Sequence, residues 1–230
     1  MNEEIDIEGL RGLCIPGGNS SKVAYLIYPA VMPFNSEWLR EMASKYGVSL
    51  VVVYIPAYGW NDMLTPWPEP GETPDSPPFA GQAGKTLEII AEKVIPQAEK
   101  TLGATVDVSR NLIGVSLSGL FTLWQWMRCP LFDSIAALSG SFWYHGFIEW
   151  FEKQTIPRKS GKAFFLLGDK EPKAWIKAYR SVGVNTQKII TLLRGAGIDT
   201  EFVSVPGNHY AEPIPRVEKA FEALYVDNNR

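Results

Sequence analysis

The chain has little that would tie it to a nucleic acid, a membrane or a metal. Its formal net charge is −3 over 230 residues and it holds no basic block, so a nucleic-acid partner is not expected. No apolar run approaches the roughly 20 residues that span a bilayer, and the acidic N-terminus does not resemble a secretory signal. Cys14 and Cys129 form no metal-spaced cluster. We therefore expect a cytoplasmic protein with reduced thiols, no membrane partner and no metal.

Histidine is equally scarce, since only His145 and His209 occur. A proton acceptor that works near neutral pH is usually histidine, so any such chemistry has two candidates. The hydrophobic share of 46% is ample for a sizeable core. The sequence leaves the oligomeric state open, with a homodimer among the options.

Apolar strand-like runs alternate with helical patterns along the chain. The clearest strand is 48–55 (VSLVVVYI), whose almost continuous apolar character suits a strand covered on both faces. A helix is predicted over 36–46, between Asn35 or Ser36 as N-cap and Gly47 as its end. The other predicted strands are 23–28, 112–115, 133–138, 163–167 and 200–205. The other predicted helices are 82–102, with a kink or break at Pro96, 117–128, 149–153, 173–194, with Gly183 as an interruption, and 215–225. The pattern predicts a single α/β domain, 1–230, with a mostly parallel sheet and helices on both faces.

The most informative motif is 114–119 (GVSLSG), between a predicted strand and a predicted helix. A serine on such a turn, flanked by small residues, is typical of a nucleophile elbow. Ser116 is the expected nucleophile, which points to a serine hydrolase or an acyltransferase. Ser118 stands where the usual motif has its second glycine. It is either a tolerated small residue or an extra hydroxyl near the site.

A serine hydroxyl needs a general base, and the base needs a group that orients it. His209 follows the predicted strand 200–205 and so lies at the carboxyl edge of the sheet, where Ser116 is also expected; His145 lies in an aromatic loop. We therefore predict His209 as the base. Glu171 is the preferred acid, because it lies further out in the loop after strand 163–167. Asp169 is the second choice, since it could instead bond backbone amides of the turn.

The remaining parts of the expected site are backbone donors and pocket walls. The Leu117 amide is one expected oxyanion donor, and Ala30 or Val31 supplies the other, because Pro29 has no N–H. Tryptophans in two loops, Trp60, Trp67 and Trp143, are expected either to wall an apolar or aromatic substrate pocket or to pack beneath the long loop 57–78.

Several segments resemble the α/β-hydrolase superfamily, in its esterase D and enterochelin-esterase-like branch. The elbow 113–121 is similar to the G-H-S-x-G-G-L stretch of that branch, 64–68 (LTPWP) to its T-P-W-P loop, and 138–143 (LSGSFW) to its S-G-S-x-W stretch. Segments 168–172 and 207–210 resemble its G-x-x-E-P and G-x-H motifs. The resemblance covers about 23–224. It implies an α/β-hydrolase fold with N-terminal strands missing or reduced.

The resemblance also implies ester hydrolysis without a cofactor, with Ser116 as nucleophile, His209 as base and Glu171 as acid. The partner would then be a small-molecule ester. Ser118 and Val115 depart from the branch's usual glycine and histidine, and leave the substrate class open. Two alternatives remain: an acyltransferase that uses the same residues, and a binding protein of the same fold without turnover.

Overall fold

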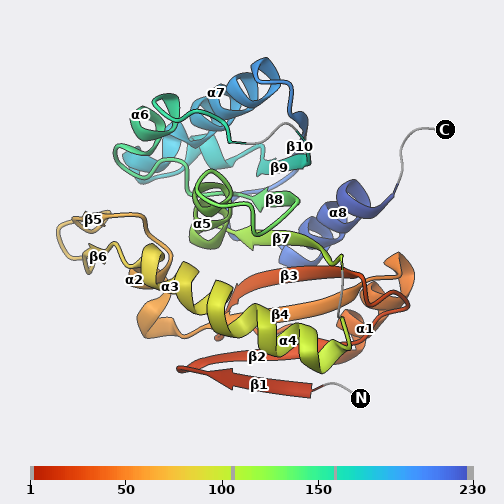
Figure 1. Cartoon of the computed structure of the whole chain (residues 1–230). Helices are drawn as coiled ribbons and strands as arrows, with labels where there is room; N and C mark the ends of the chain where they lie inside the picture. The colour runs from red at the N-terminus through yellow and green to blue at the C-terminus, as the bar shows by residue number, and fades with distance from the viewer. Residues whose placement is uncertain (1–2, 105–106, 158–159, 227–230) are drawn as a thin grey trace.

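The computed structural model describes residues 3–104, 107–157 and 160–226, and its centre is an eight-stranded sheet. The strand order is β1-β2-β4-β3-β7-β8-β9-β10 (Figure 1). The strands are β1 (Glu3–Ile7), β2 (Leu10–Ile15), β3 (Lys22–Pro29), β4 (Ser49–Ile55), β7 (Ser109–Val115), β8 (Ser134–Leu138), β9 (Lys162–Gly168) and β10 (Asp199–Val205). From β4 through β3 to β10 every neighbouring pair is parallel, as the sequence predicted.

The two leading strands are present, so the expectation that they are missing or reduced is wrong. β1 pairs antiparallel with β2, and β2 pairs antiparallel with β4. Their sequences, EEIDI and LRGLCI, mix charged and apolar residues because the edge strand is partly exposed. That mixture lacks the continuous apolar run that marked the central strands.

Helices cover both faces of the sheet. One face carries α1 (Ser36–Tyr46) and α8 (Pro213–Tyr225), whose apolar residues form one core cluster with the sheet. The other face carries α3 (Ala83–Ile89), α4 (Ile95–Leu102), α5 (Leu117–Trp126), α6 (Phe147–Glu152) and α7 (Val182–Gly195), which form a second cluster (Figure 1). α5 is buried along its whole length and lies against β7 and β8. The sheet therefore holds the turn before α5 rigidly.

Local sequence accounts for the ends of α1. The Asn35 side chain accepts hydrogen bonds from the backbone N–H groups of Glu37 and Trp38, at 2.7 and 3.3 Å. Gly47 ends the helix at φ 62°, a conformation that glycine adopts without steric cost. Of the two N-caps considered, the structure has Asn35.

The predicted helix 82–102 is a continuous helical run with an irregular middle. A π-helical segment, η2 (Ile90–Val94), joins α3 to α4, and the Ile95 N–H bonds the Ile90 carbonyl five residues back. Pro96 lies in the first turn after this segment. Proline has no N–H and clashes with the preceding turn, so a wider turn at this place relieves the clash without ending the helix.

The long loop after β4 contains short ordered elements: the 3-10 turn η1 (Ala57–Gly59), the helix α2 (Trp60–Met63) and the two-stranded ribbon β5 (Pro68–Glu69) and β6 (Phe79–Ala80). The predicted helix 173–194 is divided into η3 (Glu171–Lys173), η4 (Lys177–Ser181) and α7. The division falls before α7, and Gly183 lies in the first turn of that helix.

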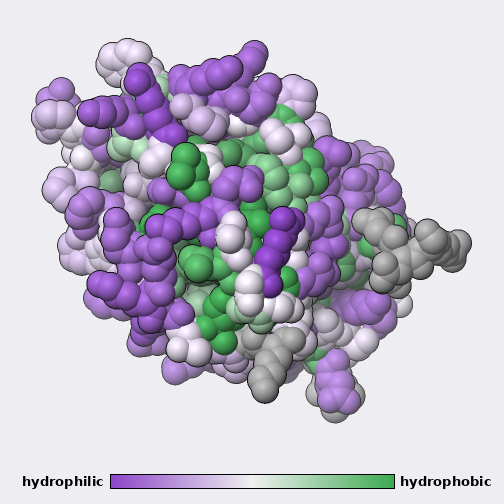
Figure 2. All heavy atoms as spheres, turned by 90° about the horizontal axis from the view of Figure 1, so that it is seen from above, coloured by the Kyte–Doolittle hydropathy of each residue, from purple (hydrophilic) through white to green (hydrophobic). Residues whose placement is uncertain are grey.

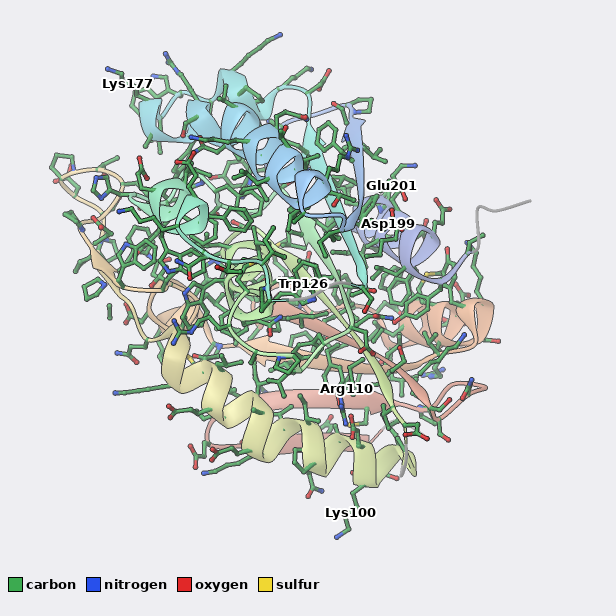
Figure 3. The ribbon with its side chains drawn as sticks, turned by 45° about the horizontal axis from the view of Figure 1, so that its top comes forward. Lys100, Arg110, Trp126, Lys177, Asp199 and Glu201 are labelled. Carbon is green, nitrogen blue, oxygen red and sulfur yellow. The ribbon has the colours of Figure 1, made fainter. Side chains whose placement is uncertain are left out.

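The outer surface is mixed in polarity. Figure 2 shows hydrophobic residues gathered among hydrophilic ones on the face seen from above. α7, at the top of Figure 1, exposes Val184. Figure 3 shows Lys100 and Lys177 pointing outward at opposite margins, whereas Trp126 is buried at the centre. Within the described residues no helix is long and apolar enough to cross a membrane.

Candidate active site

Ser116 lies on a strained turn between the end of β7 and the start of α5. Its backbone has φ 60° and ψ −122°, a region that a residue with a Cβ rarely occupies. Gly114 makes the turn sterically possible, because a Cβ there would lie 2.2 Å from the Ser118 carbonyl oxygen and 2.4 Å from Thr122 Oγ1. The strain presents the Ser116 hydroxyl at the carboxyl edge of the sheet, as the motif predicted.

Ser118 is a bracing residue beneath the turn. Its hydroxyl is fully buried and accepts a hydrogen bond from the Val115 N–H at 2.7 Å. Ser118 Oγ also lies 2.8 Å from the carbonyl oxygens of Val115 and Ile27, to which it can donate. The side chain thus ties the elbow to β3. Its hydroxyl has a structural use away from the cavity and is not an extra hydroxyl at the site.

Ser116, His209 and Glu171 form one continuous hydrogen-bonded chain. Ser116 Oγ lies 2.9 Å from His209 Nε2, and His209 Nδ1 lies 2.9 Å from Glu171 Oε2. A carboxylate can only accept, so Nδ1 carries the proton and Nε2 accepts from the serine hydroxyl. This tautomer is the one that a general base acting on serine requires.

Glu171 is buried and fully hydrogen-bonded. Its Oε1 accepts from Ser139 Oγ at 2.7 Å, from the Gly168 N–H at 2.8 Å and from Arg216 Nη1 at 3.0 Å. Burial by itself would raise the pKa of the Glu171 carboxyl, but hydrogen bonds from His209, Ser139 and Gly168 favour the charged form. Its pKa therefore lies below the ordinary value, and the group is a carboxylate at neutral pH.

Arg216 is a member of this network that sequence reasoning missed. It lies on α8 and only 5% of its surface is exposed. On an amphipathic helix an arginine is normally solvated, so its position carried no signal of burial. Only the packing of α8 against β8 and β9 brings its guanidinium to the carboxyl edge of the sheet.

The other two candidates, Asp169 and His145, have different hydrogen-bond partners. Asp169 Oδ1 accepts a hydrogen bond from the Gly207 N–H at 2.8 Å, which is the turn-bonding alternative considered for it. The His145 side chain is 85% exposed and its Nδ1 lies 3.1 Å from Glu69 Oε1. Neither side chain contacts Ser116 or His209 in the described structure.

Two serines of the loop after β8 also border the site. Ser141 Oγ lies 3.4 Å from Ser116 Oγ, and the Ser141 N–H donates to the Ser116 carbonyl oxygen. Ser139 adopts φ 48°, an uncommon conformation for a residue with a side chain, and its hydroxyl donates to Glu171. The resemblance of 138–143 to a known motif was the one sequence signal for this loop.

A cavity of about 750 Å³ opens over Ser116 and His209. Trp60 and Trp143 line it, and so do Trp175, Tyr179 and Tyr210 from the loops after β9 and β10. Trp175 and Tyr210 are 90% and 86% exposed, so they stand at the rim. Five aromatic side chains therefore line the cavity beside polar and charged ones, and they suit a flat apolar group.

Trp67 does not line this cavity, so its predicted place in the pocket is wrong. Its ring packs among Tyr144, Phe147 and Trp150, and its indole N–H donates to the His145 carbonyl oxygen at 3.1 Å. The tryptophan therefore anchors the long loop to the segment around α6. This is the packing alternative considered for these residues; Trp60 and Trp143 also pack against the core, but they line the cavity as well.

The expected oxyanion donors differ in availability. Leu117, the first residue of α5, lines the cavity, and the backbone N–H groups of a first helical turn have no partner within the helix. The Ala30 N–H donates to the Ile55 carbonyl oxygen at 2.9 Å, because β3 and β4 continue their pairing one residue beyond the strand. Ala30 is therefore not a free donor, and Val31 remains of the two alternatives.

No group of three or more histidine, cysteine, aspartate or glutamate side chains among the described residues could hold a metal ion. The contacts of Ser116, His209 and Glu171 place a serine hydroxyl beside an oriented imidazole.

A family model described as "Putative esterase" matches residues 33–197, which is more than half of the chain. The chain belongs to this family. A relative from Bacillus subtilis (strain 168), named as the uncharacterized protein YbbA, is 27% identical over 150 residues. That match covers 64% of this chain and 60% of the relative, so less than two thirds of the relative's own length is matched.

Solved structures show that the fold is that of the α/β-hydrolases. An IroE-like serine hydrolase from Shewanella oneidensis superposes with a TM-score of 0.80 at 16% identity, over 98% of this chain and 80% of the other. The siderophore hydrolase EstA from Aspergillus nidulans gives 0.75 at 19% identity, over 98% and 93%. The enterobactin and salmochelin hydrolase IroE gives 0.73 at 17% identity, over 99% and 95%.

Proposed function

We propose that this protein hydrolyses carboxylic esters through an acyl-enzyme, with Ser116 as nucleophile. The observation that carries the proposal is the unbroken chain from Ser116 Oγ through His209 to Glu171, with 2.9 Å at each of the two contacts, beneath an aromatic cavity. Membership of the esterase family supports the same activity.

In the proposed reaction, Ser116 Oγ attacks the ester carbonyl carbon while His209 Nε2 takes the hydroxyl proton. The Glu171 carboxylate holds Nδ1–H and stabilises the imidazolium that forms. His209 then gives the proton to the departing alcohol, which leaves the acyl group on Ser116. A water molecule, deprotonated by the same nitrogen, attacks the acyl carbon; His209 then gives that proton to Ser116 Oγ as the bond between Oγ and the acyl carbon breaks and the acid leaves.

The negative oxygen of the tetrahedral intermediates needs backbone donors. We assign this role to the N–H groups of Leu117 and Val31. Leu117 follows the nucleophile and starts α5, where the helix dipole also favours negative charge. Val31 lies in the loop that follows β3, the neighbour of β7 in the sheet.

The proposed substrate is a small ester with an aromatic or apolar acyl group. Trp60, Trp143 and Tyr179 supply flat walls, and the Trp143 and Tyr179 rings lie 4.4 Å apart between centroids. Lys170 and Lys173 also line the cavity, and among the ion pairs of the described residues neither has a carboxylate partner. An acidic group on the substrate would be favoured beside them. Two structural neighbours are named as siderophore hydrolases and another as a ferulic acid esterase. These names support an ester as the substrate here.

Replacement of the nucleophile tests the proposal. Ser116→Ala should lower kcat for p-nitrophenyl esters by about 10⁴-fold or more, as for other serine enzymes that lose this residue. Circular dichroism and Tm should stay close to wild type. A fluorophosphonate probe should label Ser116 and not the neighbouring Ser141, as read by peptide mass spectrometry. Wild-type turnover in Ser116→Ala would exclude the mechanism. An active wild-type enzyme whose Ser116 takes no label from the probe would contradict it equally.

A further inference from the structure

Arg216 connects three loops that surround the proposed base and acid. Its Nη1 donates to Glu171 Oε1 at 3.0 Å and to Ser139 Oγ at 2.6 Å, and its Nη2 donates to the Asn208 carbonyl oxygen at 2.6 Å. Ser139 follows β8, Glu171 follows β9, and Asn208 precedes His209 in the loop after β10. One planar guanidinium thus fixes the relative positions of the groups on either side of the imidazole.

The chain leaves space for this guanidinium by placing glycines against it. A Cβ at Gly168 would lie 2.4 Å from the Gly207 carbonyl oxygen and 2.9 Å from Arg216 Nη2. Gly207 itself has φ 114°, a conformation that residues with a Cβ rarely adopt, and a Cβ there would lie 2.8 Å from the Ala211 Cβ. The close approach of these two loops therefore depends on residues without side chains at the place where the arginine enters.

The two oxygens of the Glu171 carboxylate have different partners, a guanidinium and an imidazole. One oxygen, Oε1, contacts Arg216, and the other, Oε2, contacts His209. The Glu171 and Arg216 side chains are only 3% and 6% exposed, so water screens their charges weakly. A permanent positive charge on one side of the carboxylate reduces its net attraction for a proton on the imidazole.

We propose that Arg216 is a positioning residue that acts through Glu171. It locks the carboxylate for the contact with His209. It also extends to lower pH the range in which the imidazole is neutral and can act as base. The inference rests on the proposed function, in which His209 is the base. The inference goes beyond the proposed function, because it gives α8 a part in setting the pH range of the reaction. α8 lies outside the matched region 33–197.

Other ionisable groups also lie around the imidazole. Lys170, Tyr179 and Glu72 line the same cavity, and the Tyr210 ring meets the His209 ring edge-on at 5.5 Å. Asp169 bonds the Gly207 N–H near the start of the His209 loop. All of these groups remain in the variants described next, so a change in pH profile between variants reports on Arg216 itself.

The test compares Arg216→Met and Arg216→Lys with the wild-type enzyme on a p-nitrophenyl ester. Arg216→Met keeps an unbranched side chain but removes the guanidinium and its charge. We expect its kcat/KM to fall roughly 10- to 100-fold, the usual cost of losing a group that orients a reacting residue. We also expect the acid limb of its kcat/KM profile to move to higher pH by roughly one unit, because loss of the positive charge favours the protonated imidazole. Arg216→Lys keeps the charge, so its kcat/KM should fall while its acid limb stays near the wild-type position.

Arg110→Met is the matched control. Arg110 is also paired with a glutamate, Glu99, but lies near the start of β7, at the end of that strand opposite Ser116 (Figure 3). Its replacement should lower Tm and leave the acid limb in place. An acid limb that stays at the wild-type position in Arg216→Met, whether or not kcat/KM falls, would overturn the proposal, since a purely structural role predicts that result.

A second measurement separates this inference from the proposed function, and it does not depend on Arg216→Met being well folded. Arg216→Lys in a Glu171→Gln background should lower kcat/KM much less than in the wild-type background, because its effect passes through Glu171. Equal losses in the two backgrounds would overturn the role of Arg216 and leave the Ser116–His209 mechanism intact. Full activity in Glu171→Gln alone would instead contradict the proposed role of the acid.

Discussion

Two glutamate–arginine pairs lie at opposite edges of the same sheet, and they differ in what the glutamate contacts next. At the edge where the parallel strands begin, Glu99 on α4 accepts two hydrogen bonds from Arg110 and one from the Tyr25 hydroxyl at 3.1 Å. At the carboxyl edge, Glu171 contacts Arg216 and His209. The pairs have the same charges and similar hydrogen bonding, but the third partner is a phenol in one and an imidazole in the other.

The third partner decides what each pair can do. Burial, with the nearby Glu99 charge, raises the pKa of Tyr25 well above its ordinary value, so the phenol stays neutral and the cluster only joins α4, β3 and β7. An imidazole ordinarily changes charge near neutral pH. His209 also contacts Ser116 under a cavity, whereas the Glu99 pair contacts no residue that lines this cavity. A buried ion pair therefore does not mark a catalytic site until its neighbours are known.

The largest effect that would sharpen this comparison is expected from Glu171→Gln measured beside Glu99→Gln. An amide at position 171 can donate to Nδ1 and favours the wrong tautomer of His209. The analogous change in other serine enzymes lowers kcat by about 10⁴-fold, so we expect roughly 10³- to 10⁴-fold here. Glu99→Gln should leave kcat unchanged and lower stability by about 1–3 kcal/mol. Equal losses of activity in both variants, by steady-state ester hydrolysis, would remove the distinction between the pairs.

A smaller effect concerns stability at acid pH. The pKa of Glu171 is lower in the folded protein than its ordinary value of 4.5, so its charged form stabilises the fold above that value. This contribution is lost as pH falls through the folded-state pKa. The Tm of wild type should therefore exceed that of Glu171→Gln at pH 7, and the gap should narrow as pH falls toward 3 in thermal melts. A gap that is constant with pH would show that the charge of Glu171 contributes nothing.

The smallest effect is expected at the second-choice acid. Asp169→Asn keeps an oxygen that can accept from the Gly207 N–H, and the side chain is exposed, so the cost should be below about 1 kcal/mol, or less than about fivefold in kcat/KM. Steady-state kinetics beside Glu171→Gln measures it directly. A loss comparable with that of Glu171→Gln would move the role of the acid from one carboxylate to the other.

Much of the fold follows from local patterns. The run 48–55 is apolar at almost every position because it is covered on both faces, and such a run can be recognised without tertiary information. α1 carries its own cap and its own terminating glycine. β1 and β2 were not recognised, since an edge hairpin with one exposed side has no comparable signal.

Part of the site could be predicted from the sequence for a similar reason. Ser116 lies in a turn whose geometry needs glycine at 114, so the sequence around it is constrained locally. Glu171 and Asp169 share one loop, and no local rule separates a carboxylate that points inward from one that caps a turn. The choice between Ala30 and Val31 stayed open in the sequence, because strand pairing extends one residue beyond the end of β3, which only the position of β4 decides.

The sequence by itself determined the alternation of strands and helices, the elbow at Ser116 and the restriction of the base to one of two histidines. These depend on backbone sterics and on composition, which act over a few residues. Only the tertiary structure decided which carboxylate meets His209, that Trp67 packs away from the cavity and that Arg216 is buried against Glu171. Those contacts join β8, β9, β10 and α8, and the relative placement of separate elements is set by the packing of the whole sheet.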